Sequence, residues 1–415
     1  MNERFHGRDR KTAVLPIPNG RRHIDSLDGI RGIAVILVLA VHFQTMAVLP
    51  QTSGISRQVT HVMSWGWCGV DLFFVLSGFL ITSILLDGKN TERRFWTFYI
   101  RRILRIFPLY YSVVLLCLAT SIFLRHSSSN NALGPSPIGW VAYLLYLQNW
   151  WMPFAKLRHM VSLGPFWSLA IEEQFYLIWP LCVWQLPTKA LLKICILGIL
   201  GPFLLRWSLM LHATDALAYV AYMNTLTRMD GLLAGGFCAI VVRDVVLLAR
   251  VQKWMPIAVV GALSGLALIV LRGHDIWNDQ EVLVYGHLLL AIGFGCLVLS
   301  AYLLDGGRTP FDRAMRSRGL IVFGKYSYGI YVYQGFVLEL TLHFFRYRPW
   351  WGHSTPYALT VLLGWIAVPF LIAFVSYHLL EKRFLRLKPP FAASSLNLSG
   401  VESALQRRPL QGPIA

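Results

Sequence analysis

The stretch "LDGIRGIAVILVLAVHFQTMAVLP", residues 27–50, sets the first expectation about the fold. Its run of Ala, Val, Ile and Leu has the length of roughly 20 residues that a helix needs to cross a membrane. Arg31 nevertheless stands near one end, and His42 lies inside the apolar run. Eleven helical positions turn by about 1,100°, so both side chains share one face, about 16 Å apart along the axis.

Ionisable side chains at such depth are costly and usually face a cavity. The alternative is structural: His42 would bond to a carbonyl of a neighbouring helix, and Arg31 would reach out to a lipid phosphate. Taken alone, the stretch leaves both interpretations open.

Composition extends the membrane interpretation to the whole chain. The 415 residues are 56% hydrophobic and 14% charged, with a mean hydropathy of +0.54, whereas soluble proteins carry about 25% charged residues. The net charge of +18 does not indicate nucleic-acid binding, because the basic residues lie between apolar blocks and not along one face. We therefore predict an all-α, polytopic integral membrane protein.

About ten transmembrane helices are expected. They cover residues 30–49, 67–86, 107–124, 165–185, 190–210, 228–243, 254–271, 282–304, 320–343 and 357–380. The stretch "PIGWVAYLLYLQNWWMP" (137–153) is short and rich in Trp and Tyr, so it is expected to be interfacial or re-entrant. We expect residues 1–26 to be a basic cytoplasmic segment, 27–388 the membrane domain and 389–415 a disordered cytoplasmic tail, with no cleaved signal and no appended soluble domain.

The distribution of basic residues supports this count and its orientation. With a cytoplasmic N-terminus and ten spans, the inner segments hold 26 of the 38 Lys and Arg residues, and the outer loops hold seven. Such a bias is what the positive-inside rule predicts. Both termini are therefore expected in the cytoplasm.

The six cysteines are isolated in or beside apolar segments, which favours packing roles over disulfides or metal ligation. They are Cys68, Cys117, Cys182, Cys195, Cys238 and Cys296. The sequence also shows no GxSxG or HExxH motif, so neither a covalent serine mechanism nor a metal mechanism is indicated.

Two further groups of polar residues accompany His42. Asp71 and Ser77 lie in the apolar stretch "WCGVDLFFVLSGFLIT", and Arg102 and Arg105 share a helix face in "YIRRILRIFP". Guanidinium groups match phosphate oxygens, so this arginine pair, with Arg101, is suited to a phosphorylated ligand. An ordinary positive-inside contact with anionic lipid is the alternative.

The fourth expected span, "LGPFWSLAIEEQFYLIWP", carries two adjacent carboxylates, Glu172 and Glu173. Neighbouring helix positions point about 100° apart, so the two cannot serve one face. One could meet an arginine while the other meets His42 or a substrate; a buried Glu–Arg pair between helices is the alternative. In "LTRMDGLLAGG" we expect Arg228 and Asp230 to form a structural pair.

An imidazole can accept a proton near neutral pH, and a carboxylate beside it could hold its tautomer. Such a pair suits a base that activates a sugar hydroxyl. A cytoplasmic arginine cluster suits a nucleotide-like donor such as an acyl-coenzyme A, whose arm could thread along the face shared by Arg31 and His42.

The ordered motifs resemble the acyltransferase 3 family of membrane O-acyltransferases, which modify bacterial surface polysaccharides, peptidoglycan and some antibiotics. The matching pieces are "LDGIRGIAVILVLAVH", "GVDLFFVLSGFLIT", "FYIRRILRIFP", "GPFWSLAIEEQFYLIWP", "TRMDGLLAGG", "GKYSYGIYVYQ" and "YHLLEKRF", between residues 27 and 384. The resemblance carries the family's Arg-x10-His pattern onto Arg31 and His42, and its RxxR pair onto Arg102 and Arg105. It carries the WSLxxEEQFY segment onto Trp167, Ser168, Glu172, Glu173 and Tyr176. Where family members often have a late histidine, this chain has Gln334.

The resemblance implies an O-acyltransferase of the bacterial inner membrane that moves an acyl group, most simply acetyl, from acyl-coenzyme A to a sugar hydroxyl of a surface polysaccharide or glycolipid. His42 would be the base, assisted by Glu172, and Arg31, Arg102 and Arg105 would bind the donor. Supporting or substrate-binding roles are expected for Asp71, Ser77, Trp167, Ser168, Glu173 and Tyr176.

No bound cofactor or metal is expected. The expected partners are acyl-coenzyme A, a carbohydrate acceptor, membrane lipids and proteins of polysaccharide synthesis. The rival interpretation is a transporter or flippase of lipid-linked sugars, which also needs charges around a central cavity but transfers no acyl group.

Overall fold

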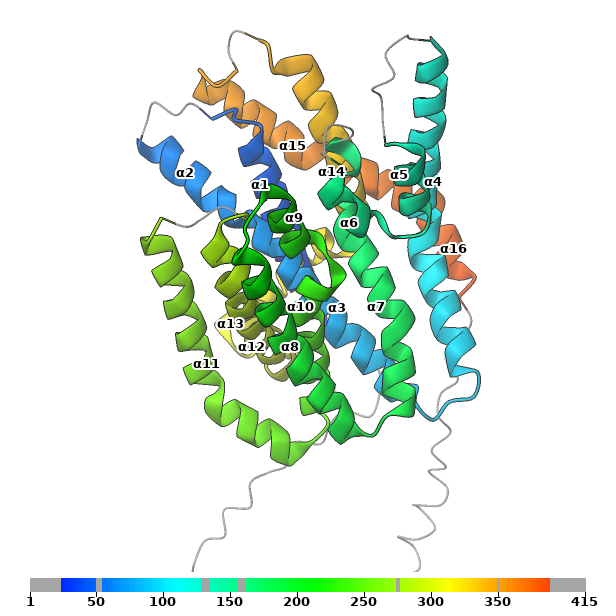
Figure 1. Ribbon diagram of the computed structural model, residues 1–415, viewed down its shortest axis with the longest axis vertical. Helices are drawn as coiled ribbons and strands as arrows, with labels where there is room; N and C mark the ends of the chain where they lie inside the picture. The colour runs from blue at the N-terminus through cyan, green and yellow to red at the C-terminus, as the bar shows by residue number, and fades with distance from the viewer. Residues whose placement is uncertain are drawn as a thin grey trace, which may run out of the picture.

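The computed structural model describes residues 24–49, 54–127, 135–155, 161–273, 277–348 and 351–388, and every regular element in them is helical (Figure 1). The first half contains α1 Asp25–Thr45, α2 Gly54–Ser64, α3 Cys68–Asp87, α4 Arg94–Ser127, α5 Pro137–Leu144, α6 Gln148–Trp151, α7 Phe166–Gln185 and α8 Thr188–Met210. The second half contains α9 Asp215–Met223, α10 Thr225–Val241, α11 Val245–Leu271, α12 His287–Leu303, α13 Pro310–Met315, α14 Arg318–Phe345, α15 Thr355–Ser376 and α16 Lys382–Arg386. Single turns join them: η1 Trp65–Trp67, η2 Met152–Phe154, η3 Val161–Leu163 and the π-helical turns η4 Val282–Gly286 and η5 Tyr377–Glu381.

The described residues confirm the all-α expectation, and seven helical segments among them are long and apolar enough to cross a membrane. They are Asp25–Thr45, Gly54–Asp87, Arg94–Phe123, Thr188–Met210, Val245–Leu271, Val282–Leu303 and Thr355–Arg386. Three other expected spans form helices that fall outside this set: α10 has only 17 residues, and α7 and α14 carry polar side chains among their apolar ones. A multi-pass membrane protein follows, whereas the count of ten stays a prediction.

Several expected boundaries shift in the structure. The first span ends at Thr45 and not at residue 49, and Ala47 just beyond it adopts a left-handed backbone with φ of 54°. The arginine-rich segment before Pro108 is already helical, because α4 runs without interruption from Arg94. The stretch 137–153 breaks into the short pieces α5, α6 and η2. Residues 1–23 and 389–415 lie outside the described residues.

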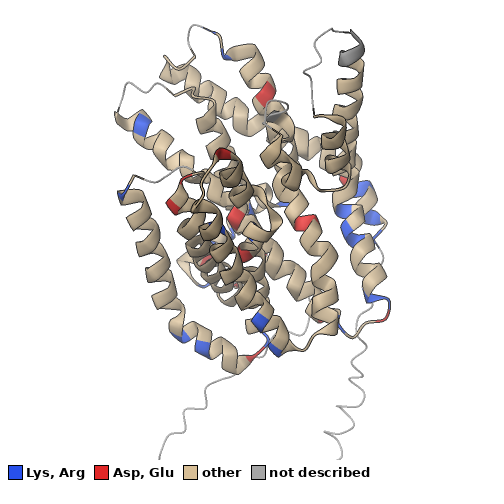
Figure 2. Cartoon of the chain, viewed as in Figure 1, with Lys and Arg blue, Asp and Glu red and all other residues tan. Residues whose placement is uncertain are grey.

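The helix α1 lies inside the bundle, packed against α14 and α3. In Figure 1, α11 borders the bundle at the left and α4 at the right, with α1, α3 and α10 between them. Figure 2 shows Lys and Arg at the lower ends of α8 and α11 and from the middle of α4 downward, with few in the upper part of the view. This asymmetry agrees with the positive-inside bias of the sequence and makes the lower end the expected cytoplasmic side.

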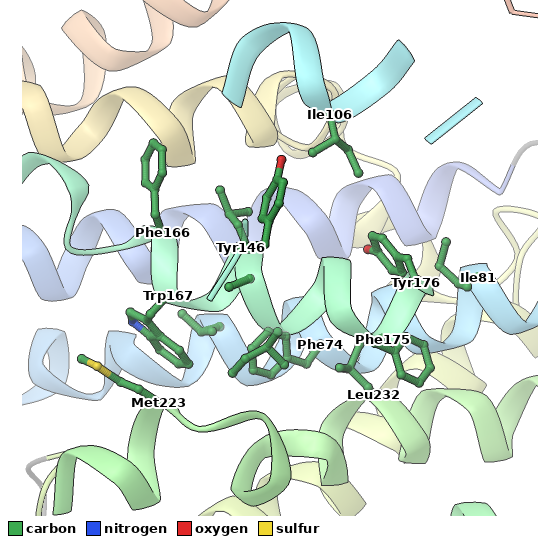
Figure 3. Close-up of a cluster of buried hydrophobic side chains, with 14 of the residues drawn as sticks. Phe74, Ile81, Ile106, Tyr146, Phe166, Trp167, Phe175, Tyr176, Met223 and Leu232 are labelled. Atoms are coloured by element: carbon green, nitrogen blue, oxygen red, sulfur yellow. The ribbon is translucent and has the colours of Figure 1, made fainter. Parts of the chain in front are cut away.

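Aromatic side chains fill the space around α7. Figure 3 shows Phe166 and Trp167 toward one end of this helix and Phe175 and Tyr176 toward the other. All four are buried and belong to the largest hydrophobic cluster of the described residues. The aromatic packing fixes α7, and therefore Glu172 and Glu173, against α3 and α4.

Glycines bring α3 and α10 into backbone contact. A Cβ atom on Gly78 of α3 would overlap the carbonyl oxygen of Leu232, and one on Gly235 of α10 would overlap that of Val75. Small residues of this kind allow membrane helices to pack closely. The close approach also brings together the polar groups of α3 and α10 described below.

Replacing Gly78 with leucine is expected to lower the free energy of unfolding by about 1–3 kcal/mol or more, because the new side chain must separate two packed backbones. The matched control is Gly364→Leu in α15, where a Cβ atom meets no other atom within 4 Å. Unfolding of the two purified variants in mixed detergent micelles measures the difference. Equal stability of the two would show that α3 and α10 do not pack this closely.

Candidate active site

Polar side chains from four helices, α1, α3, α4 and α7, lie close together inside the bundle. They are Arg31 of α1, Ser77 of α3, Arg102 and Arg105 of α4, and Glu172, Glu173 and Tyr176 of α7. We call this group the inner polar cluster. The sequence predicted each of these residues, and the structure brings all seven together although they come from segments up to 145 positions apart.

Arg102 is held by aromatic faces. Its guanidinium carbon lies 5.8 Å from the ring centre of Phe98 and 5.6 Å from that of Tyr176, distances typical of cation–π contacts. Glu172 and Glu173 attract it electrostatically, but within the described residues neither carboxylate reaches ion-pair distance. Arg102 is half-buried and Arg105 is exposed. Their donors are therefore available to a ligand.

Arg31 has a partner on its own helix. Its Nη1 donates to Asp28 Oδ1 at 2.9 Å, and the two side chains are 26% and 15% exposed. Arg31 was expected to bind the donor. In the structure its guanidinium is already paired with Asp28, an acid that was not among the predicted site residues. Electrostatic contact with Arg102 and Arg105 still places Arg31 at the edge of the inner polar cluster.

Glu172 faces hydroxyl groups. Ser77 Oγ and Tyr176 Oη form a short hydrogen bond, and the Glu172 carboxylate lies beside both. Within the described residues, no hydrogen bond or ion pair joins Glu172 to His42. The geometry thus favours a role for Glu172 in the inner polar cluster over direct orientation of the His42 ring.

The backbone of α1 orients His42. The ring atom Nδ1 lies 2.8 Å from the carbonyl oxygen of Val38, one turn earlier. A carbonyl only accepts hydrogen bonds, so a neutral His42 must carry its proton on Nδ1 and leave Nε2 free as a proton acceptor. The side chain is half-buried. This is the tautomer that a general base needs.

His42 is separated from the inner polar cluster by packed side chains. Val35 and Val38 share its face of α1 and are 0% and 1% exposed. Access along this face would require these two valines to move aside. The alignment of Arg31 and His42 on one face is retained because α1 is an uninterrupted helix from Asp25 to Thr45.

A second polar group is fully enclosed. Asp71 Oδ1 accepts from Arg228 Nη2 at 2.8 Å and from His287 Nδ1 at 3.0 Å, and Arg228 Nη1 lies 3.2 Å from His287 Nε2. All three side chains are at most 4% exposed. The rings of Phe74, Trp167 and Tyr222 also surround the Arg228 guanidinium, at 5.0 to 5.6 Å. We call Asp71, Arg228 and His287 the buried triad.

The buried triad overturns the predicted pairing of Arg228 with Asp230. Asp230 instead pairs with Arg206, at 2.8 Å. The helix period explains the difference, because positions two apart point about 160° away from each other. Sequence reasoning also missed His287; the signal that could have found it is the one used for His42, a histidine in an apolar run.

The remaining predicted residues, Trp167 and Ser168, lie outside the inner polar cluster. Trp167 stacks on Arg228 beside the buried triad. Ser168 Oγ lies 2.5 Å from Tyr331 Oη, and both hydroxyls lie close to the carbonyl of Pro165. Gln334 is fully buried, and neither amide atom has a hydrogen-bond partner among the described residues. Ser168 therefore contributes to helix packing in this structure and does not contact the inner polar cluster.

Comparison with known proteins identifies the family. A family model described as an acyltransferase domain matches residues 24–380. The chain belongs to the acyltransferase 3 family. That range contains His42, the inner polar cluster and the buried triad, so the recognition made from the ordered motifs is confirmed. No solved structure matches the chain.

Curated relatives carry related names. The peptidoglycan O-acetyltransferase OatA of Listeria monocytogenes is 30% identical over 381 residues, which is 87% of this chain and 56% of the relative. The O-acetyltransferase OatA of Staphylococcus aureus is 25% identical over 328 residues, 75% of this chain and 50% of the relative. A putative peptidoglycan O-acetyltransferase of Bacillus subtilis, YrhL, is 36% identical over 171 residues, 39% of this chain and 24% of the relative. This chain thus spans about half the length, or less, of the relatives it matches.

Proposed function

We propose that this protein is a membrane O-acetyltransferase that moves an acetyl group from cytoplasmic acetyl-coenzyme A to a sugar hydroxyl of a cell-surface polysaccharide. The observation that carries the proposal is the state of His42, with Nδ1 bound to its own helix and Nε2 free, on the face of α1 that leads to the inner arginines. Family membership and the names of the relatives support it. Because those relatives are named for peptidoglycan, its glycan is the first acceptor to test.

In this proposal, His42 Nε2 accepts the proton of the sugar hydroxyl as that oxygen attacks the thioester carbonyl carbon. The carbon–sulfur bond then breaks, and the imidazolium returns its proton to the coenzyme A thiolate. The Nδ1–Val38 hydrogen bond holds the ring in one tautomer through both steps. The alternative, an acyl group carried on Nε2 itself, uses the same free nitrogen.

The donor would bind with its phosphates near Arg102 and Arg105, because guanidinium groups bind phosphate oxygens in bidentate geometry. Its flexible arm would then follow α1 for about 16 Å to His42, with Val35 and Val38 moving aside. We assign Ser77, Glu172, Glu173 and Tyr176 to the walls of the donor site. Asp71 and Trp167 would act indirectly, by fixing α3 and α7.

We also propose ten spans within residues 27–388, both termini in the cytoplasm and a location in the bacterial inner membrane. The gathering of Lys and Arg at one end of the bundle in Figure 2 supports this orientation. In this orientation, the lower ends of the helices would face the side where coenzyme A is available, and the outer loops would face the acceptor.

The test is transfer of labelled acetyl from acetyl-coenzyme A to peptidoglycan by membranes that contain the protein. We expect label in the glycan fraction, released by mild base as expected for an ester. Membranes that lack the protein are the control. Binding of coenzyme A without any label transfer would point to another acceptor, whereas transport of a lipid-linked sugar without coenzyme A binding would favour the flippase.

A further inference from the structure

The segment that follows α15 turns back onto the arginine face of α4. The π-helical turn η5 leads into α16, and both pack against α4, as Figure 1 shows at the right of the bundle. A π-helical turn inserts an extra residue and so changes the direction in which the following side chains point; such turns are frequent at functional sites. Here it directs the end of the described chain, at Lys388, toward α4.

Lys388 lies among positive charges. The charged groups that act on it most strongly are Arg105, Arg102 and Arg101 of α4. Burial and these three guanidinium groups lower the pKa of Lys388 to about 8. The side chain is half-buried. Among the described residues, no carboxylate lies within ion-pair distance of its amine.

The nearby carboxylates interact electrostatically with the arginines, whereas the charged groups that act most strongly on Lys388 are all arginines. Glu381 of η5 is 8% exposed and interacts with Arg105, and Glu172 and Glu173 interact with Arg102. Like charges brought together at a partly enclosed site repel each other. A polyanion with several phosphate oxygens would relieve that repulsion, whereas a single carboxylate would not satisfy Lys388, Arg102 and Arg105 together.

We propose that Lys388 completes a phosphate-binding site with Arg102 and Arg105, so that the protein selects donors that carry a phosphorylated nucleotide. The proposal rests on the proposed function, because it names the donor of the same reaction. It assigns a ligand-binding role to the segment after α15, which packs on α4 from outside the helices α1, α3 and α7. A lipid phosphate offers the same chemistry, so the test must separate the two sources.

The test measures binding of coenzyme A and of pantetheine, which lacks the phosphates, to the full chain in nanodiscs of zwitterionic lipid. We expect Lys388→Gln to weaken coenzyme A binding about tenfold, as loss of one charge-assisted hydrogen bond would, and to leave pantetheine binding unchanged. Lys388→Arg should keep most of the affinity. The control is Lys382→Gln, an exposed lysine of the adjoining α16, which should bind coenzyme A like the wild type.

Three results would overturn the inference, and they differ from one another. Wild-type affinity of Lys388→Gln for coenzyme A, with weak binding by Arg102→Gln, would remove Lys388 from the site and keep the proposed function. No effect of Lys388→Gln in zwitterionic nanodiscs, with loss of anionic-lipid binding in nanodiscs containing phosphatidylglycerol, would assign Lys388 to lipid. No binding of coenzyme A by the wild type would contradict the proposed function itself.

Discussion

Replacement of His42 by alanine is expected to lower acetyl transfer at least about 100-fold, the range over which a positioned general base contributes. The reason is the free Nε2 that the bond from Nδ1 to Val38 leaves on the ring. A mechanism in which His42 itself carries the acyl group would need the same nitrogen. The variant should therefore lose activity whether transfer is direct or passes through an acyl-histidine. The measurement is labelled transfer to peptidoglycan, with the amount of folded protein determined by size-exclusion chromatography.

The matched control is His378→Ala. His378 also places Nδ1 close to the carbonyl four residues earlier, 2.9 Å from Phe374, but it is exposed on η5. Both variants lose the same kind of backbone hydrogen bond, so loss of that bond alone would not explain a difference in transfer between them. Wild-type turnover by a folded His42→Ala variant would remove His42 from the reaction.

Replacement of Asp71 by asparagine is expected to lower the free energy of unfolding by about 3–5 kcal/mol, because it leaves the charge of Arg228 buried without an anion. Arg228 is 0% exposed, and its other contacts are the His287 ring, aromatic faces and the carbonyl of Tyr222. None of these supplies a negative charge. Equilibrium unfolding in mixed detergent micelles measures the loss.

The control for this prediction is Asp87→Asn, which removes the same charge from α3 at an exposed pair. Asp87 and Arg243 are 47% and 31% exposed and 2.6 Å apart, and such surface pairs contribute about 0–1 kcal/mol. A loss no larger for Asp71→Asn than for Asp87→Asn would show that Arg228 finds another partner or solvent. If folded Asp71→Asn protein also loses transfer, the buried triad is needed to position the reacting groups.

The sequence alone identified much of the candidate site because the relevant patterns are local. Helical period placed Arg31 and His42 on one face, and α1 keeps them there as a continuous helix. The arginines of α4 and the carboxylates of α7 stood out because charge is rare in apolar segments. The ordered motifs then gave the family. These inferences needed only spacing along a single helix or the order of segments.

The pairing of helices was decided by the tertiary structure. The period of α10 could not show that Arg228 meets Asp71 and His287 from two other helices, or that Asp230 turns toward Arg206. The sequence likewise could not show that Glu172 faces Ser77 and Tyr176, or that the chain brings Lys388 back to the arginines of α4. Helix formation depends on neighbours in the chain, whereas these contacts depend on which backbones approach closely, as at Gly78 and Gly235. Which backbones approach closely depends on packing among segments that are distant in the sequence, so the pattern within a single helix cannot predict it.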